Sequence, residues 1–278
     1  MDLIFFDLDG TLLNSQSEIS SFTKETLLLL SEKDIAFTVA TGRTMLSAKS
    51  ILEGHAFVLP HIYNNGVTVW DPKSQQLTLD NILSDDETHH IIEVALAHNI
   101  TPFINVITEE TSQNQCEHIV FHPQAQHEVE KQLISKYFMR THAKVLPLES
   151  LPKGSQVTNI SMIANASTID TMWLKIKGHD KLVAYSGPAH EGKQYKWMDV
   201  HHCLANKGTA VSNLKTKLGA QNVICFGDSD NDKSMFALAD ESYAPANAQN
   251  DIKDSATRVI GHNHEDGIAH FLRERFFL

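Results

Sequence analysis

The stretch Asp7-Leu8-Asp9-Gly10-Thr11 decides how this chain of 278 residues is interpreted, because it directly follows the apolar run Leu3 to Phe6. A short apolar run that ends in polar residues is typical of a buried strand. Asp7 and Asp9 are two positions apart, so in a regular strand they would face the same side. Gly10 indicates that the chain turns there. We therefore expect two carboxyl groups near one strand end.

Two more apolar runs, Ala36 to Ala40 and Val223 to Phe226, are typical of buried strands. Ser20 to Lys33 lies between the first two runs and has the Ser, Thr and leucine pattern of a helix. Asn206 is expected to cap a helix that stops at Gly219. The alternation predicts an α/β fold with a doubly wound, mostly parallel, Rossmann-like core sheet. Two further elements expected in this part of the chain are a helix at 45–53 and a strand with a turn at 61–66.

The middle of the chain has a different texture, which indicates an inserted α+β domain at 82–192. The flanking parts, 1–81 and 193–278, would together form the core domain. Within the insertion, Ser167 is expected to cap a helix that runs to Lys177, with Asp170 three residues after the cap. The other features of the insertion are a helix at 85–98, alternating residues at 101–108, a histidine-rich stretch at 113–127, and strands at 157–164 and 181–186.

The chain carries 34 acidic and 23 basic residues, and its formal net charge of −11 argues against binding to nucleic acid or to an anionic membrane. A small phosphorylated metabolite stays compatible, because a local cluster of donors in one cleft suffices to bind it. The three cysteines are widely spaced, which favours a reducing compartment. No apolar stretch reaches the roughly 18 residues of a membrane span. We expect a cytoplasmic protein that is a monomer or a weak homo-oligomer.

Ligands of parallel α/β sheets bind beyond the carboxyl ends of the strands, so the residues after the apolar runs are the first candidates for a site. With their near neighbours they are Asp7, Asp9, Thr41, Gly42, Arg43, Gly227, Asp228, Asn231 and Asp232. Carboxylates brought close together repel unless a proton or a cation neutralises them. Hard oxygen donors favour Mg²⁺, which often completes its shell with substrate phosphate. The set therefore predicts Mg²⁺ and a phosphorylated substrate.

Two aspartates near one strand end suit phosphoryl transfer. One carboxylate can attack phosphorus to form an acyl phosphate, while the second protonates the leaving oxygen and later activates water. Lys207 lies in the first turn of an expected helix, where its charge opposes the helix dipole unless an anion binds there. Thr41 can offer its hydroxyl group to the same anion.

Four separated signatures make the resemblance to a known family specific. In chain order they are Asp7-Leu8-Asp9-Gly10-Thr11-Leu12, Thr41-Gly42-Arg43, Asn206-Lys207-Gly208 and Gly227-Asp228-Ser229-Asp230-Asn231-Asp232. The sequence resembles the haloacid dehalogenase superfamily in its Cof-like branch of capped phosphatases. The resemblance covers nearly the full length, since the family's large cap is inserted between the threonine and lysine signatures.

The resemblance implies a role for each core residue. Asp7 would be the nucleophile and Asp9 the general acid and base, while Thr41 and Lys207 would bind the transferring phosphoryl group. Asp7 and Asp228 would contact Mg²⁺ through their side chains, and Asp9 through its backbone carbonyl. An inserted cap at 82–192 would set substrate specificity.

The same resemblance places four more residues at the site. Gly42, Asn65 and Asn231 are expected beside the substrate, and Asp232 completes the set expected at the metal. Arg43 either touches the substrate or pairs with a core carboxylate, and the sequence leaves both roles open.

The function expected is Mg²⁺-dependent hydrolysis of small phosphate monoesters, such as sugar phosphates or phosphorylated cofactor precursors. Two alternatives stay open. A phosphomutase would return the phosphoryl group to its substrate, and a receiver-like module would use a long-lived phospho-aspartate to alter the affinity for a partner. An acid/base residue at position 9 favours turnover over such a switch.

Overall fold

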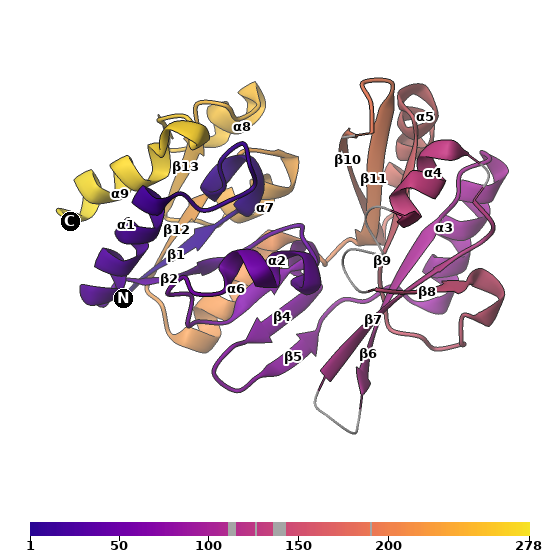
Figure 1. Ribbon diagram of the computed structural model, residues 1–278, viewed down its shortest axis with the longest axis horizontal. Coiled ribbons are helices and arrows are strands. Elements are labelled where there is room, and N and C mark those ends of the chain that lie inside the picture. Colours follow the sequence, from indigo (N-terminus) through magenta and orange to yellow (C-terminus); the bar gives the residue numbers. More distant parts are fainter. Residues whose placement is uncertain (111–114, 126, 136–142, 190) are drawn as a thin grey trace. The chain divides into compact units, whose positions relative to one another are not determined.

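The computed structural model describes residues 1–110, 115–125, 127–135, 143–189 and 191–278. They divide into two compact units, which we call the core unit (Met1–Asp80 with Asn206–Leu278) and the inserted unit (Asn81–Ala205). In Figure 1 the core unit carries the colours of both chain ends, indigo to purple and orange to yellow. The core is therefore assembled from segments that lie far apart in the sequence.

The core unit is built on a five-stranded sheet in the order β14-β13-β12-β1-β2, with every neighbouring pair parallel. The strands are β1 (Asp2–Phe6), β2 (Ala36–Val39), β12 (Asn222–Phe226), β13 (Glu241–Pro245) and β14 (Arg258–Ile260). The three apolar runs of the sequence form the central strands and one edge strand. This confirms the predicted parallel sheet.

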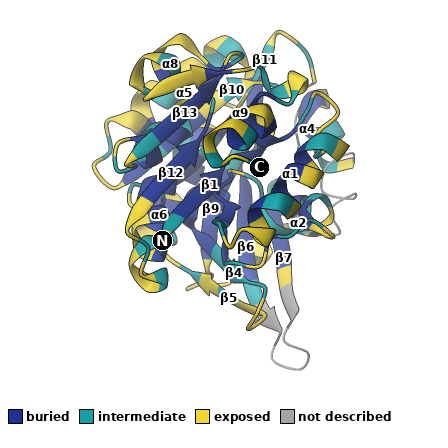
Figure 2. Cartoon of the chain, turned by 90° about the vertical axis from the view of Figure 1, so that its left-hand side faces the viewer, coloured by how far each residue is buried: buried dark blue, intermediate teal, exposed yellow. Residues whose placement is uncertain are grey.

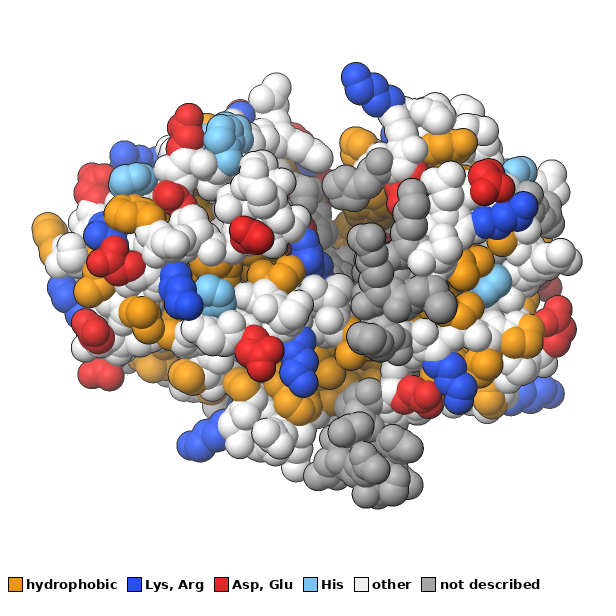
Figure 3. All heavy atoms as spheres, viewed as in Figure 1, with side chains coloured by type: hydrophobic (Ala, Val, Ile, Leu, Met, Phe, Trp, Pro, Cys, Tyr) orange, Lys and Arg blue, Asp and Glu red, His pale blue; other side chains and the backbone are white. Residues whose placement is uncertain are grey.

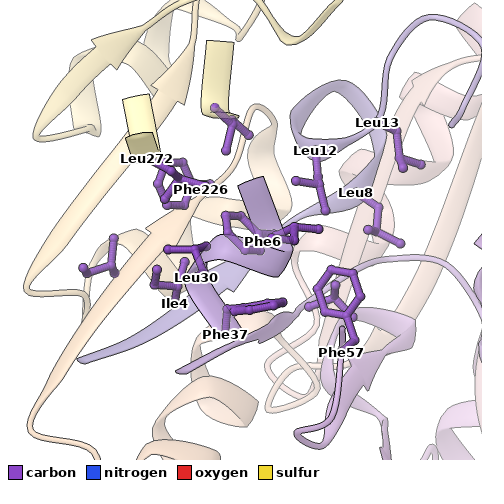
Figure 4. Close-up of a cluster of buried hydrophobic side chains, with 14 of the residues drawn as sticks. Ile4, Phe6, Leu8, Leu12, Leu13, Leu30, Phe37, Phe57, Phe226 and Leu272 are labelled. Carbon is purple, nitrogen blue, oxygen red and sulfur yellow. The ribbon is translucent and has the colours of Figure 1, made fainter. Parts of the chain in front are cut away.

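Helices cover both faces of this sheet, and β1 shows why. Ile4 and Phe6 belong to a cluster with α1 (Ser21–Glu32) and α9 (Gly267–Phe276), part of which Figure 4 displays. Leu3 and Phe5 point to the opposite cluster, with α6 (Lys207–Leu218), α7 (Lys233–Phe236) and α8 (Asn250–Ser255). Because both faces are covered, β1, β2, β12 and β13 are buried along most of their length (Figure 2). The doubly wound core is thus confirmed.

A smaller antiparallel sheet follows the second core strand. It consists of β3 (His61–Tyr63), β4 (Thr68–Asp71) and β5 (Gln76–Leu79), and a parallel bridge from Ala40 to Ile62 connects it to the end of β2. Helix α2 (Met45–Leu52) precedes it, and a 3-10 turn at Asn64–Gly66 follows β3. The helix, strand and turn expected here are confirmed, whereas the hairpin of β4 and β5 was not anticipated.

The inserted unit contains a six-stranded sheet in the order β10-β11-β9-β6-β7-β8, antiparallel except between β7 and β8. One face packs against α3 and α5 through residues such as Ile91, Ile160 and Met172. Residues 113, 114 and 126 of the histidine-rich stretch lie outside the described part. The elements of this unit are α3 (Asp85–Ala97), β6 (Phe103–Glu110), β7 (Gln115–His122), α4 (Glu128–Leu133), β8 (Lys144–Pro147), β9 (Val157–Asn165), α5 (Ala166–Lys177), β10 (Leu182–Pro188) and β11 (Tyr195–His202).

Two expectations for the insertion are wrong in detail. Its second boundary lies at 205/206 instead of 192/193, because β11 pairs with β9 and β10. Helix α5 begins at Ala166 after Asn165, so Ser167 is inside the helix and does not cap it. Asp170 instead accepts a hydrogen bond from Lys196 Nζ at 2.6 Å.

The surface gives two further observations. No described helix combines the length and the apolar character that a membrane span requires. On the face of the core unit in Figure 3, Lys and Arg side chains are interspersed with Asp and Glu side chains. The negative net charge is therefore not gathered into one patch on this face.

Gly208 controls how closely α6 approaches α7. A Cβ atom at Gly208 would lie 2.3 Å from the backbone oxygen of Ser234. We expect Gly208→Ala to destabilise the core by about 1 to 3 kcal/mol, because the two segments must separate. Gly178→Ala is the matched control, since its Cβ would meet nothing closer than 3.7 Å. Thermal unfolding checks both, and equal melting temperatures would contradict the close contact.

Candidate active site

The candidate site begins where two neighbouring strands end. β1 and β12 pair with Phe6 opposite Phe226, so Asp7 and Gly227 leave the sheet side by side. The Asp7 amide still donates to the Phe226 carbonyl at 2.9 Å, which extends the ladder by one residue. The carboxyl ends of parallel strands are where α/β folds bind ligands.

Three carboxyl groups meet at this edge. Asp7, Asp228 and Asp232 each offer an oxygen, and these oxygens lie within 4.8 Å of one another. Over the described residues, this is the one group of three or more His, Cys, Asp and Glu side chains close enough to hold a metal ion. The sequence predicted all three residues at one site, and the structure brings them together.

Lys207 supplies the positive charge inside this cluster. Its Nζ donates to Asp7 Oδ1 at 2.6 Å and to Asp232 Oδ1 at 2.7 Å, and its side chain is 0% exposed. It is the first residue of α6, whose N-cap Asn206 accepts a hydrogen bond from the Thr209 amide at 2.9 Å. Burial acts to lower the pKa of Lys207, but Asp232 and Asp7 outweigh it and raise that pKa. The ammonium group is therefore charged.

One ammonium group does not balance three carboxylates. Burial, the largest cause, raises the pKa of Asp7 well above its ordinary value; Asp232 and Asp228 add to this, and Lys207 opposes it. Burial and the charge of Asp232 raise the pKa of Asp228 to about 6. The cluster therefore takes up a proton or a cation. Its oxygen donors fit a hard divalent ion such as Mg²⁺.

Asp232 holds the loop after β12 in place. Its Oδ2 accepts hydrogen bonds from the amides of Asp228 and Ser229 at 2.8 and 2.9 Å, while its Oδ1 accepts from Lys207. Both oxygens are thus engaged within the protein. Asp228, in contrast, accepts from Thr11 Oγ1 at 3.0 Å through Oδ1 only, among the bonds described.

The turn after β1 fits closely against Asp228. Gly10 has φ +73°, and a Cβ atom there would lie 2.4 Å from Asp228 Oδ2. Asn247 Nδ2 donates to the Gly10 carbonyl at 2.7 Å and anchors the turn from the other side. Thr11 and Asn247 are site residues that sequence reasoning missed. Thr11 is part of the first signature, but no role was predicted for it. Asn247 follows β13, and the residues after parallel strands are candidates for a site.

The residues expected beside the substrate also come together. Asn231 Nδ2 donates to Asn65 Oδ1 at 2.9 Å, so the loops after β12 and β3 touch. Gly42 lies against both, since a Cβ atom there would be 3.2 Å from Asn65 and 3.5 Å from Asn231. Thr41 is buried, and its Oγ1 accepts a hydrogen bond from the Arg43 amide at 3.1 Å.

Asp9 stands apart from the acidic cluster. Its carboxylate receives two hydrogen bonds of 2.6 Å from Arg43, one from Nε and one from Nη2. The side chain of Asp9 is 54% exposed, in contrast to the buried Asp7. Of the two roles left open for Arg43, the structure contains the pairing with a core carboxylate.

Comparison with protein families matches nearly the whole chain. A family model described as haloacid dehalogenase-like hydrolase matches residues 4–272. The crystal structure of a haloacid dehalogenase-like hydrolase from Bacteroides thetaiotaomicron superposes with a TM-score of 0.76 at 22% identity, covering 99% of both chains. That likeness concerns the fold.

Two curated relatives extend the comparison to named enzymes. The chain is 28% identical to the 5-amino-6-(5-phospho-D-ribitylamino)uracil phosphatase YwtE of Bacillus subtilis, over 98% of this chain and 97% of the relative. It is 26% identical to the pyridoxal phosphate phosphatase YbhA of Escherichia coli, over 97% of each. The similarity therefore spans both units.

The raised pKa of Asp228 predicts a pH-dependent stability of the metal-free protein. Its value of about 6 exceeds the ordinary 3.8, so the native state binds the proton more tightly than the unfolded chain. This stabilisation is complete below about pH 4 and is lost as the pH rises through 6. We expect the free energy of unfolding to fall by about 2 to 3 kcal/mol over this pH range, and Asp228→Asn should make it less dependent on pH. Denaturant titrations from pH 4 to 7 measure the free energy of unfolding of both proteins. The same dependence on pH in wild type and in Asp228→Asn would refute the raised pKa of Asp228.

Proposed function

The chain belongs to the haloacid dehalogenase-like hydrolase family, and we propose that it hydrolyses small phosphate monoesters through an aspartyl phosphate on Asp7. It is an enzyme of the phosphatase type. The observation that carries the proposal is the pairing of Asp7 with Lys207 beside Asp228 at the ends of β1 and β12. The ammonium group and the adjoining donors suit the charge of a transferring phosphoryl group.

The reaction has two steps. An Asp7 carboxylate oxygen attacks phosphorus, the bond to the leaving oxygen breaks, and that oxygen takes the proton of the Asp9 carboxyl group. Water then attacks the acyl phosphate and gives a proton to Asp9, while the bond to Asp7 breaks and restores its carboxylate. The sum is ester plus water to alcohol plus phosphate.

The phosphoryl group would be held by residues from four segments of the core unit. Lys207 is fixed at the start of α6, and Thr41 is buried at the end of β2. Asn231 in the loop after β12 touches Asn65 in the loop after β3, and Gly42 lies against both. These three residues are therefore suited to positioning the phosphate ester. Positioning of this kind is a large part of catalysis in phosphoryl transfer.

Mg²⁺ is the cofactor that the donor set fits. Asp7 and Asp228 would bind it through their carboxylates, with the backbone carbonyl of Asp9 as a third ligand. Asp232 would support the site from beside, since its two oxygens already accept hydrogen bonds from Lys207, Asp228 and Ser229. When bound, the ion supplies neutralisation of charge on the acidic cluster and on the phosphoryl oxygens.

The organic part of the substrate is proposed to be a phosphorylated cofactor precursor or a sugar phosphate. The relatives named above act on a phosphorylated ribitylaminouracil and on pyridoxal phosphate. The inserted unit, residues 81–205, would act as the cap that selects the substrate and excludes water during the first transfer.

Replacement of the nucleophile gives the direct test. We expect wild-type protein with Mg²⁺ to release phosphate from a panel of sugar phosphates, pyridoxal phosphate and ribitylaminouracil phosphate. Asp7→Asn should lower kcat by at least about 10³-fold, because the acyl phosphate no longer forms. The control is Asp2→Asn, which changes an aspartate at the start of the same strand. Full activity of the Asp7 variant would rule out the mechanism.

The same panel separates the alternatives. An isomerised product without free phosphate would identify a mutase. A long-lived phospho-Asp7 without turnover would identify a receiver-like module.

Proton and metal compete for the acidic cluster, which predicts how Mg²⁺ affects stability. Because the pKa of Asp228 lies at about 6, the ion should raise the melting temperature by several degrees at pH 7.5 and much less at pH 5. Asp228→Asn should abolish the shift, and Asp2→Asn should keep it. Calorimetry with MgCl₂ measures this, and an equal shift in both variants would place the ion elsewhere.

A further inference from the structure

Arg43 makes two parallel hydrogen bonds to Asp9 that hold its carboxyl group in one orientation. Both bonds measure 2.6 Å, from Nε to Oδ2 and from Nη2 to Oδ1. This fork arrangement fixes the plane of a carboxyl group, which a single bond does not. Asp9 itself sits on a turn where the next residue, Gly10, has φ +73°. The geometry of Asp9 thus depends on a partner 34 positions away.

Arg43 is itself firmly placed by the segment around it. Its amide donates to Thr41 Oγ1 at 3.1 Å, and its carbonyl accepts from the Asn64 amide at 2.9 Å. Its Nη1 lies 3.4 Å from the Ser47 carbonyl at the start of α2. The Arg43 side chain is 22% exposed, although the Asp9 side chain that it binds is 54% exposed. The less exposed partner therefore holds the more exposed one.

We propose that Arg43 is the positioning residue for Asp9, and that it acts on the step in which the leaving oxygen takes its proton from the Asp9 carboxyl group. The inference rests on the proposed function, since it presumes attack by Asp7 on phosphorus. Arg43 would serve proton transfer to the leaving group and not the binding of the phosphoryl group.

The leaving group distinguishes these two roles. In p-nitrophenyl phosphate the departing phenolate is stable without a proton, whereas an alkyl oxygen needs one as the bond to phosphorus breaks. A misplaced Asp9 therefore slows only the alkyl ester. A lost phosphate contact slows both esters alike, because the phosphoryl group is the same in each.

The experiment measures the single-turnover rate of phosphoenzyme formation with p-nitrophenyl phosphate and with the best alkyl phosphate of the wild-type panel. We expect Arg43→Ala to lose about 10²-fold on the alkyl ester and to stay within about threefold on the aryl ester. Arg43→Lys should resemble the alanine variant, because an ammonium group does not make the two parallel bonds. Methylguanidinium should restore part of the alkyl rate in Arg43→Ala.

Two further variants serve for comparison. Asp9→Asn should show the same selective loss, and adding Arg43→Ala to it should cost little more, because both act on one group. Arg273→Ala is the matched control: Arg273 pairs with Glu25 at 2.8 Å with side-chain exposures of 26% and 64%. It should leave both rates unchanged.

Three outcomes would overturn the inference. Equal loss on both esters would assign Arg43 to the phosphoryl group or to the fold, and a rise in KM alone would assign it to substrate contact. Full rescue by lysine would show that charge suffices without orientation. If wild-type protein turns over neither ester, the proposed function fails first, and the role of Arg43 falls with it.

Discussion

The buried ammonium group of Lys207 is the interaction on which the site depends. It joins Asp7 at the end of β1 to Asp232 after β12, at 2.6 and 2.7 Å, from the first residue of α6. A buried charge without a partner is costly, so these three residues stabilise one another only as a set. Three segments, of which two lie 200 positions apart and the third 25 positions further along the chain, are thereby fixed at one point. The cluster still carries more negative than positive charge, which prepares it for a cation.

Glycines allow the backbones of the same segments to pack closely. Gly208 lets α6 come within reach of Ser234, and Gly66 leaves room for the Asn206 carbonyl, where a Cβ atom would lie at 2.6 Å. Gly227 likewise leaves room for Asp232, whose Cγ atom a Cβ atom would approach to 2.4 Å. Each glycine stands beside a residue of the charged cluster or of the helix that carries it. The ion pairs of the cluster therefore depend on tight backbone packing around them.

The sequence predicted the part of the fold that repeats a simple pattern. Apolar runs such as Val223 to Phe226 mark buried strands, and carboxylates that follow them lie together in the candidate site, because parallel strands end at one edge. Pairings that arise only in three dimensions were missed. Asp170 was assigned to a helix start but binds Lys196 on β11, and β11 itself lacks a distinct apolar run. Arg43 was left open because its partner, Asp9, is 34 positions away.

The two aspartates of the first signature are held in opposite ways, and the proposed chemistry explains the difference. Asp7 is buried and fixed by Lys207 and by its strand, which suits a nucleophile that must meet phosphorus along one line. Asp9 is more than half exposed and bound by one side chain. It serves the leaving oxygen in the first step and the attacking water in the second, and both lie on the side of phosphorus opposite Asp7 because each displacement is in line. A buried Asp7 fixed by Lys207 and a more exposed Asp9 oriented by Arg43 therefore divide the reaction between them.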